Sequence, residues 1–152
     1  MRAISDGLFE LHEDGAIALV GGYSPTSELH HFPRLDTCPY SGATDIETVT
    51  LSAYATLWAW TAVTAAPPGY AGPVPFGFGV VELEREHLRV ITRLTESDPA
   101  QLTFGQPMRL VAETLPGEDG EAVVTWAFQA QTGGPDGVPG VVDDGGPEVG
   151  AA

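Results

Sequence analysis

The chain has very few basic residues and cysteines for its length, and each shortage excludes a class of protein. Among 152 residues there is one cysteine and no lysine or asparagine, and 21 acidic residues stand against 6 arginines, for a formal net charge of −15. A surface with this charge repels phosphate backbones and anionic membranes. The chain has no N-glycosylation sequon because it has no asparagine, and it has no internal disulfide because it has one cysteine.

Long apolar runs are also missing. The first residues, MRAISDGLFELHEDG, lack the apolar segment of a secretory signal. The most apolar stretch, Leu57 to Ala66, has about half of the roughly 20 residues that a membrane-spanning helix needs. We therefore expect a soluble, cytoplasmic protein that binds neither membranes nor nucleic acid.

Short segments rich in β-branched and aromatic residues dominate the middle of the chain and predict a mainly β fold. Strands are predicted at residues 16–22, 46–52, 55–64, 76–84, 87–94, 107–114 and 121–131. Asp98 and Pro99 predict one helical turn, and the prolines of residues 66–75 predict a loop. The spacing of Ile4, Leu8 and Leu11 predicts a short N-terminal helix, with a frayed tail as the alternative. This pattern fits a small barrel or sandwich.

The composition changes at residue 132. Ten of the last 21 residues are Gly or Pro and none is aromatic, so this segment has too little apolar surface to offset the entropy of ordering. We predict a disordered acidic tail at residues 132–152, a barrel at residues 46–131 and a separate N-terminal part at residues 1–45.

The stretch from Ser24 to Ser41 has the spacing of a zinc knuckle, with S-x-x-S, ten residues, then C-x-x-S. The four ligand positions hold Ser24, Ser27, Cys38 and Ser41. Structural zinc takes four thiolates or imidazoles, and a serine hydroxyl titrates too high to compete. His30 or His31 could assist only in a new geometry, because neighbouring side chains of an extended segment point to opposite sides. We predict no cofactor and no stoichiometric zinc.

Catalytic motifs are not visible in the sequence. There is no nucleophile elbow, no P-loop and no dinucleotide fingerprint. The histidines, which are His12, His30, His31 and His87, are scattered without an obvious carboxylate and nucleophile nearby. Gly77 and Gly79 lie inside a predicted strand, where glycine typically allows a bulge or the close approach of another backbone. Cys38 next to proline is interpreted as a small buried apolar residue.

The knuckle resembles the zinc-ribbon segment of a bacterial and archaeal family first catalogued as a domain of unknown function, with the pattern C-x-x-C-G-x-x-x-F-P-x-x-x-x-C-P-x-C-G. Phe32-Pro33 and Cys38-Pro39 fall where the family has F-P and C-P. Further along, TLWAWTAVT, VPFGFGVVELE and LTFGQPMRLVAE are similar to blocks of its barrel, and the resemblance covers residues 8–131. It implies an N-terminal helix and a degenerate, metal-free, rubredoxin-like zinc ribbon, followed by an OB-fold barrel.

Members of this family resemble non-catalytic partners of thiolase-fold enzymes that act on acyl-CoA. The resemblance implies an accessory subunit of a hetero-oligomer that supports the complex and helps to shape the substrate channel of a thiolase, retro-aldolase or acyltransferase, with acyl-CoA as the substrate of the complex. Exposed aromatics and prolines offer apolar contact area at low entropic cost. We therefore predict a partner interface formed by His31, Phe32, Pro33, Tyr70, Pro75, Phe76 and Phe78, and expect Phe32→Asp to weaken association without unfolding the barrel.

Two other functions stay open. OB-folds often bind nucleic acid on aromatic platforms, for which Tyr54, Trp58, Trp60 and Phe76 are candidates, although the charge of −15 argues against this. A stand-alone acyl-CoA-binding module or hydrolase would need cationic side chains for the CoA phosphates. The candidates for that role are Arg34, Arg89, Arg93 and Arg109.

Overall fold

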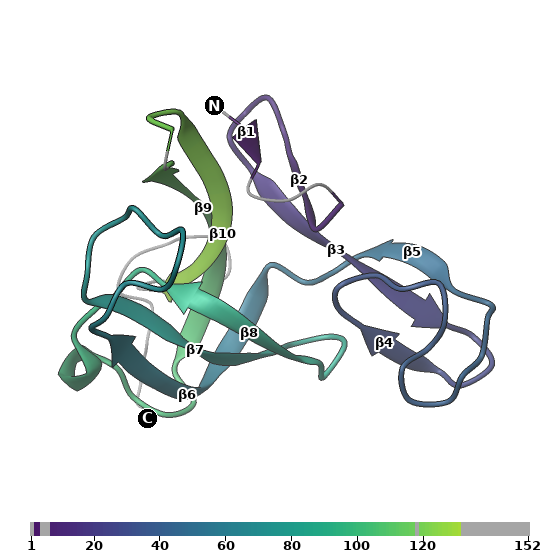
Figure 1. Ribbon diagram of the computed structural model, residues 1–152. Coiled ribbons are helices and arrows are strands. Elements are labelled where there is room, and N and C mark those ends of the chain that lie inside the picture. Colours follow the sequence, from purple (N-terminus) through teal and green to yellow (C-terminus); the bar gives the residue numbers. More distant parts are fainter. Residues whose placement is uncertain (1, 4–6, 118, 132–152) are drawn as a thin grey trace.

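The computed structural model describes residues 2–3, 7–117 and 119–131, which form two β-sheets (Figure 1). The predicted tail at residues 132–152 lies outside the described residues. The strands are β1 (Arg2–Ala3), β2 (Phe9–Leu11), β3 (Ile17–Ser24), β4 (Leu29–His31), β5 (Glu47–Thr50), β6 (Tyr54–Val63), β7 (Phe76–Leu83), β8 (Arg89–Leu94), β9 (Pro107–Pro116) and β10 (Ala122–Ala130). Within the described part of the chain, no helix is long and apolar enough to cross a membrane.

Five strands close into a barrel. Around the barrel the order is β6-β7-β8-β10-β9, and β9 pairs back onto β6. All neighbouring strands are antiparallel except β8 and β10, which are parallel. A short 3-10 helix, η1 (Pro99–Gln101), follows the third barrel strand, and the Asp98 side chain caps it by accepting a bond from the Ala100 amide. This closed five-stranded arrangement is consistent with the predicted OB-fold.

The barrel interior is filled by side chains that alternate along each strand with outward-facing ones. The most deeply buried members are Leu57, Val81, Leu83, Val90, Leu94, Met108 and Phe128, each no more than 2% exposed. Burying one such side chain contributes roughly 1.5–3 kcal/mol. The core therefore extends through all five strands of the barrel.

Two glycines of β7 let neighbouring backbone approach the barrel closely. A Cβ atom at Gly77 would lie 2.1 Å from the Glu96 carbonyl oxygen, and one at Gly79 would lie 2.3 Å from the Ala59 carbonyl oxygen. No side chain fits at these distances. The predicted structural role of Gly77 and Gly79 is confirmed.

The second sheet is built on the long strand β3. The first half of β3 pairs with β2, and its second half pairs with β4 on one side and β5 on the other. In Figure 1, β3 runs from beside the barrel out to a lobe that contains β4, β5 and their loops. The strand β5, which the predicted boundary at residue 46 assigns to the barrel, thus pairs outside it. Ile17, Leu19 and Leu51 pack into the same core cluster as the barrel residues, so the two sheets share one core.

The predicted N-terminal helix is wrong where the chain is described. Phe9–Leu11 form β2, with Phe9 opposite Leu19 of β3, and residues 4–6 lie outside the described part. The Phe9 ring lies 6.1 Å from that of Trp126, centroid to centroid. Gly7 has a φ of 83°, and the chain turns at His12–Gly15, so the segment between them is too short for a stable helix. Pairing with β3 and the Trp126 contact decide its structure.

Candidate functional site

The four former ligand positions lie together in the lobe at the end of β3. Ser24 ends β3, Ser27 lies in the next turn, and Cys38 and Ser41 lie in a second turn. The Ser27 Oγ atom is 2.8 Å from Ser24 Oγ, 2.7 Å from Ser41 Oγ and 3.8 Å from Cys38 Sγ. The two turns thus bring all four side chains to one point, which we call the hydroxyl cluster.

The hydroxyl cluster does not fit zinc, because it has one thiol and three hydroxyls where a structural site needs thiolates or imidazoles. Sulfurs around a tetrahedral zinc lie about 3.8 Å apart, as follows from a Zn–S bond of about 2.3 Å. The serine oxygens are instead at hydrogen-bonding distance. Across the described residues there is no group of three or more Cys, His, Asp or Glu side chains that could hold a metal.

Asp45 completes the hydroxyl cluster. Its Oδ1 accepts a 2.7 Å hydrogen bond from the Ser24 hydroxyl, and its Oδ2 accepts bonds from the Thr26 hydroxyl (2.6 Å) and the Thr26 amide (2.9 Å). The Thr26 hydroxyl, followed by that of Ser24, lowers the pKa of Asp45 to about 2. Sequence reasoning missed this residue, because it lies outside the knuckle pattern and 21 positions from Ser24.

We predict that Asp45→Ala lowers the melting temperature at neutral pH and that the loss shrinks in acid. The folded-state pKa lies below the ordinary value of 3.8. The contribution of the Asp45 carboxylate to the free energy of unfolding is therefore fully present above about pH 4 and is lost as the pH falls toward about 2. Thermal melts followed by circular dichroism from pH 7 to pH 2 measure the difference in melting temperature between the variant and the wild type. Asp36→Ala, at a side chain 94% exposed, is the control. If Asp45→Ala lowers the melting temperature at pH 2.5 as much as at pH 7, the ionised Asp45 carboxylate does not stabilise the fold in this way.

The Cys38 thiol is shaped by the same cluster. A hydrogen bond from the Ser41 hydroxyl lowers its pKa to about 7, against burial, which raises it. The residue is 2% exposed. The buried position predicted from sequence is confirmed, and the hydroxyls add partners that favour the thiolate.

The two neighbouring histidines of β4 have different environments. His31 is 1% exposed, and its Nε2 accepts a 3.1 Å bond from the Leu35 amide, while its Nδ1 has no partner among the described residues. A Cβ at Gly22 would lie 2.4 Å from His31 Nε2, so glycine makes room for the ring. His30 instead lies against the ring of Tyr23, with centroids 4.6 Å apart. The rings thus point in different directions, as the sequence predicts for an extended segment.

Phe32 and Pro33 follow at the edge of the lobe. The Phe32 ring packs edge-on against Trp126 of β10, with centroids 5.6 Å apart, and contacts the shared core. Pro33 is exposed. In this half of the predicted interface His31 and Phe32 are therefore engaged within the chain, and Pro33 is free to contact a partner.

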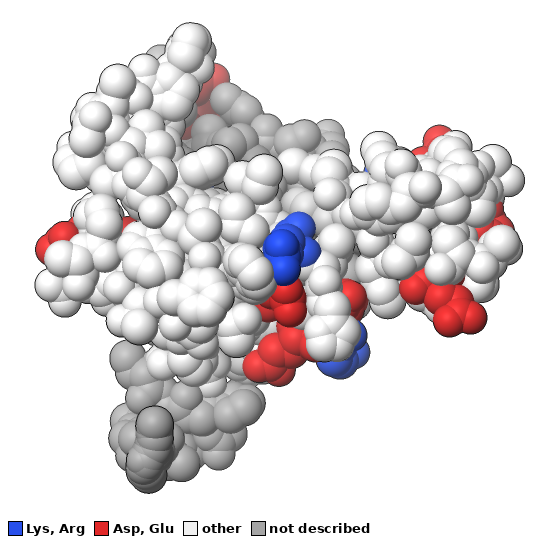
Figure 2. Space-filling view, turned by 90° about the horizontal axis from the view of Figure 1, so that it is seen from below, with Lys and Arg blue, Asp and Glu red and all other residues white. Residues whose placement is uncertain are grey.

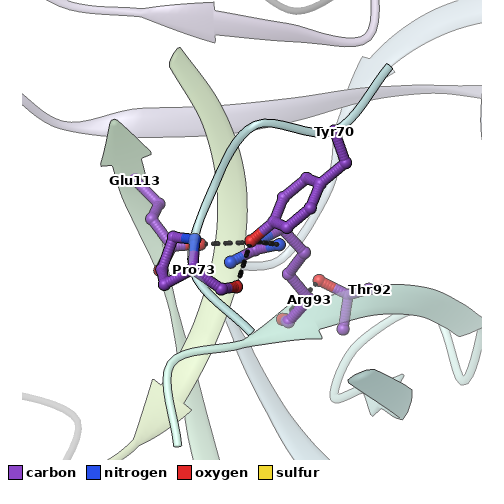
Figure 3. Close-up of polar contacts among 5 residues, drawn as sticks. All are labelled: Tyr70, Pro73, Thr92, Arg93 and Glu113. Atoms are coloured by element: carbon purple, nitrogen blue, oxygen red, sulfur yellow. Dashed lines mark hydrogen bonds and ion pairs between the residues drawn. The ribbon is translucent and has the colours of Figure 1, made fainter. Parts of the chain in front are cut away.

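Arg93 of β8 fixes the proline-rich loop between β6 and β7 (Figure 3). Its Nε donates to Glu113 of β9 at 2.7 Å, and its Nη1 donates to the Tyr70 hydroxyl at 3.4 Å. The Tyr70 hydroxyl donates to the Pro73 carbonyl oxygen at 2.7 Å. The Arg93 guanidinium also lies 4.6 Å from the centre of the Phe76 ring. One arginine thus ties two strands and a loop together.

Arg93 stays charged in this position. Burial acts to lower its pKa, but the hydrogen bonds to Glu113 and Tyr70 outweigh burial, so the pKa lies above its usual value. In this second half of the predicted interface Phe76 is 9% exposed and Tyr70 is half-buried, whereas Pro75 and Phe78 are exposed. The interface as a whole stays a prediction.

Most candidate CoA-binding arginines have acidic partners. Arg34 pairs with Asp36 at 2.6 Å, and Arg89 pairs with Glu82 at 3.2 Å, as Arg93 does with Glu113. Arg109 lines a groove of about 490 Å³ between the start of β3 and β9. These pairings leave little free positive charge for phosphates.

The scattered histidines come together only in part. His30 and His87 line one groove of about 400 Å³ with Glu28 and Glu86. The other residues around this groove, Leu29, Tyr40 and Leu88, include no serine or cysteine nucleophile. Sequence reasoning also missed Glu86, whose side chain is 5% exposed and accepts a 2.9 Å bond from the Ser52 amide. Glu86 thereby ties the β7–β8 turn to the segment that joins the two sheets.

Comparisons with known proteins agree with this architecture. Residues 48–113 match the family model of the C-terminal OB-fold domain of ChsH2. A solved structure of an Ltp2-ChsH2(DUF35) aldolase is similar in fold, with a TM-score of 0.55 and 21% identity, covering 74% of this chain and 84% of that chain. A comparison with curated proteins gave no match. The barrel is therefore an OB-fold whose residues 48–113 are similar to the C-terminal OB-fold domain of ChsH2.

Proposed function

We propose that this chain is the non-catalytic accessory subunit of a thiolase-fold enzyme that cleaves or forms a carbon–carbon bond in an acyl-CoA. The observation that carries the proposal is the match of residues 48–113 to the ChsH2 OB-fold domain. The fold similarity to an Ltp2-ChsH2(DUF35) aldolase, whose name joins two components, supports it. We place the complex in the cytoplasm, as the sequence suggests.

The contacts of the described residues favour a structural role in the complex over a catalytic one. The polar groups that meet in space bind one another: Asp45 holds the hydroxyl cluster, Arg93 holds the proline-rich loop and Glu86 holds the β7–β8 turn. Such fixed loops and turns can shape one wall of a substrate channel, while the thiolase-fold subunit supplies the nucleophile and the acid–base groups. Zinc is not needed where the hydroxyl cluster and a permanent partner supply rigidity.

Complex formation tests the proposal. The tagged full-length chain is purified from its source cells together with the proteins bound to it. Mass spectrometry identifies a thiolase-fold protein among them, and the two chains are then co-expressed. We expect them to co-elute as one hetero-oligomer whose mass is measured by light scattering. If the chain elutes alone after co-expression with each thiolase-fold protein of those cells, the proposal is wrong.

A further inference from the structure

The outer face of β6, β7 and β8 carries large apolar side chains in contact with solvent. Strand pairing places Val80 beside Ile91, with Ala59 on the far side of Val80, and places Phe78 two residues along β7 from Val80. The exposed fractions of its largest side chains are 64% for Ile91 and 37% for Phe78. Arg89 and Arg93 lie on the same side of β8 on either side of Ile91, and each is paired with a carboxylate. An exposed apolar patch of this kind often marks a site where another molecule binds.

Two aromatic rings extend this face at one end. Trp58 lies at the irregularity in β6 between Leu57 and Ala59, and it is 38% exposed. The ring of Phe104, 61% exposed, meets Trp58 edge-on at 5.4 Å between centroids. The guanidinium of Arg89 covers Trp58 at 3.6 Å. The rings are therefore held in place before any partner arrives, which lowers the entropic cost of binding.

A groove borders the other end of the face. It measures about 370 Å³, and its large apolar side chains are Leu8, Phe78, Ile91 and Trp126, with Arg93 also in the lining. A groove of this kind fits an apolar side chain that projects from a facing protein. Anchors that fill such pockets commonly dominate the binding energy of an interface.

The charges around the face argue for a different protein as the occupant. On the face itself Arg89 is paired with Glu82 and Arg93 with Glu113, so these charges balance although the chain carries −15. On the side drawn in Figure 2, basic side chains lie near the centre beside acidic ones, and further acidic side chains lie at the left edge and on the part at the right, with uncharged surface between them. A second copy would bring another −15, which opposes self-association. A near-neutral face also offers little attraction to phosphates.

We propose that the outer face of β6–β8, with Trp58, Phe78, Ile91 and Phe104, is the docking surface for the thiolase-fold catalytic subunit. The proposal rests on the proposed function and names the surface that performs it. The partner presents an apolar patch, with one apolar side chain in the groove beside Ile91 and Phe78. Except for Phe78, these residues lie outside the interface that the sequence predicts.

A pair of matched variants tests this surface. Ile91→Asp places a carboxylate on the proposed face, and Leu35→Asp does the same at an exposed leucine of the lobe, 45% exposed. Titration calorimetry with the purified catalytic subunit measures the dissociation constant. We expect Ile91→Asp to raise it about 100-fold, because the carboxylate is buried without a partner, and Leu35→Asp to leave it within about threefold. Both isolated variants should melt like the wild type.

If Ile91→Asp proves unstable, Phe104→Asp serves in its place. If the wild-type complex forms and the variant binds the catalytic subunit with unchanged affinity, this face is not the docking surface. The proposed function is then unaffected. A wild-type chain that binds no catalytic subunit overturns both. Two results would show that something other than the catalytic subunit binds this face. One is a wild-type homodimer that Ile91→Asp converts to monomer. The other is a labelled single-stranded oligonucleotide that binds the wild type and not the variant.

Discussion

Replacing Ser24, Ser27 and Ser41 with cysteine is expected to create a site for one zinc ion per chain. The two turns already bring these side chains and Cys38 to one point, with Ser27 Oγ 3.8 Å from Cys38 Sγ, which is about the spacing of sulfurs around zinc. The serine oxygens must separate by about 1 Å, and the longer C–S bonds assist this. At a free zinc concentration about 1,000-fold above the dissociation constant, the metal would stabilise the fold by about 4 kcal/mol.

Elemental analysis and thermal melts with and without a chelator measure this effect. The wild-type chain is the control and should contain no stoichiometric zinc. Since Asp45 accepts a bond from the Ser24 hydroxyl, a quadruple variant that adds Asp45→Asn to the three cysteines removes the repulsion between this carboxylate and a thiolate. If both cysteine variants fold without binding zinc, the hydroxyl cluster does not keep the geometry of a zinc ribbon. One zinc per wild-type chain would show that serine positions or nearby histidines can hold the metal.

Phe32→Asp is expected to destabilise the isolated chain by roughly 2–4 kcal/mol, since it buries a carboxylate without a partner. The Phe32 ring packs against Trp126 and the shared core. This outcome differs from the sequence-based expectation that the substitution leaves the barrel folded and only weakens association. Urea denaturation of the isolated chain measures the change.

Ile91→Asp is the matched comparison, because its side chain is exposed and its substitution should leave the free energy of unfolding nearly unchanged. Phe32→Leu, which keeps an apolar contact with Trp126, should cost less than Phe32→Asp. If Phe32→Asp is as stable as the wild type but no longer binds the partner, Phe32 is part of the docking surface and not of the core.

The barrel could be predicted because its strands are long and carry local signals. In β6 the β-branched and aromatic residues end at the prolines of residues 66–75, and in β8 the β-branched run from Val90 to Thr92 ends before Asp98-Pro99. These local signals mark the strands without information from the rest of the chain. The close approach at Gly77 could also be predicted, because glycine inside a strand has few other uses.

The N-terminal part could not be predicted in the same way. Phe9–Leu11 and Leu29–His31 are three-residue strands, too short to show a periodic pattern. The rings of Phe9 and Phe32 beside them pack against Trp126, which lies far along the chain. The role of Asp45 depends on two turns that meet only in the folded state. The apolar outer face is likewise a product of strand register, which places Ile91 near Phe78 across β7 and β8.

Turnover of acyl-CoA by the separated and recombined chains tests the accessory role most directly. The purified full-length chain, the purified thiolase-fold subunit and their mixture are assayed for cleavage or formation of the carbon–carbon bond, with release of the shortened acyl-CoA followed by chromatography. The account predicts no turnover by this chain alone and greater turnover by the mixture than by the catalytic subunit alone. Turnover of acyl-CoA by this chain alone would contradict it.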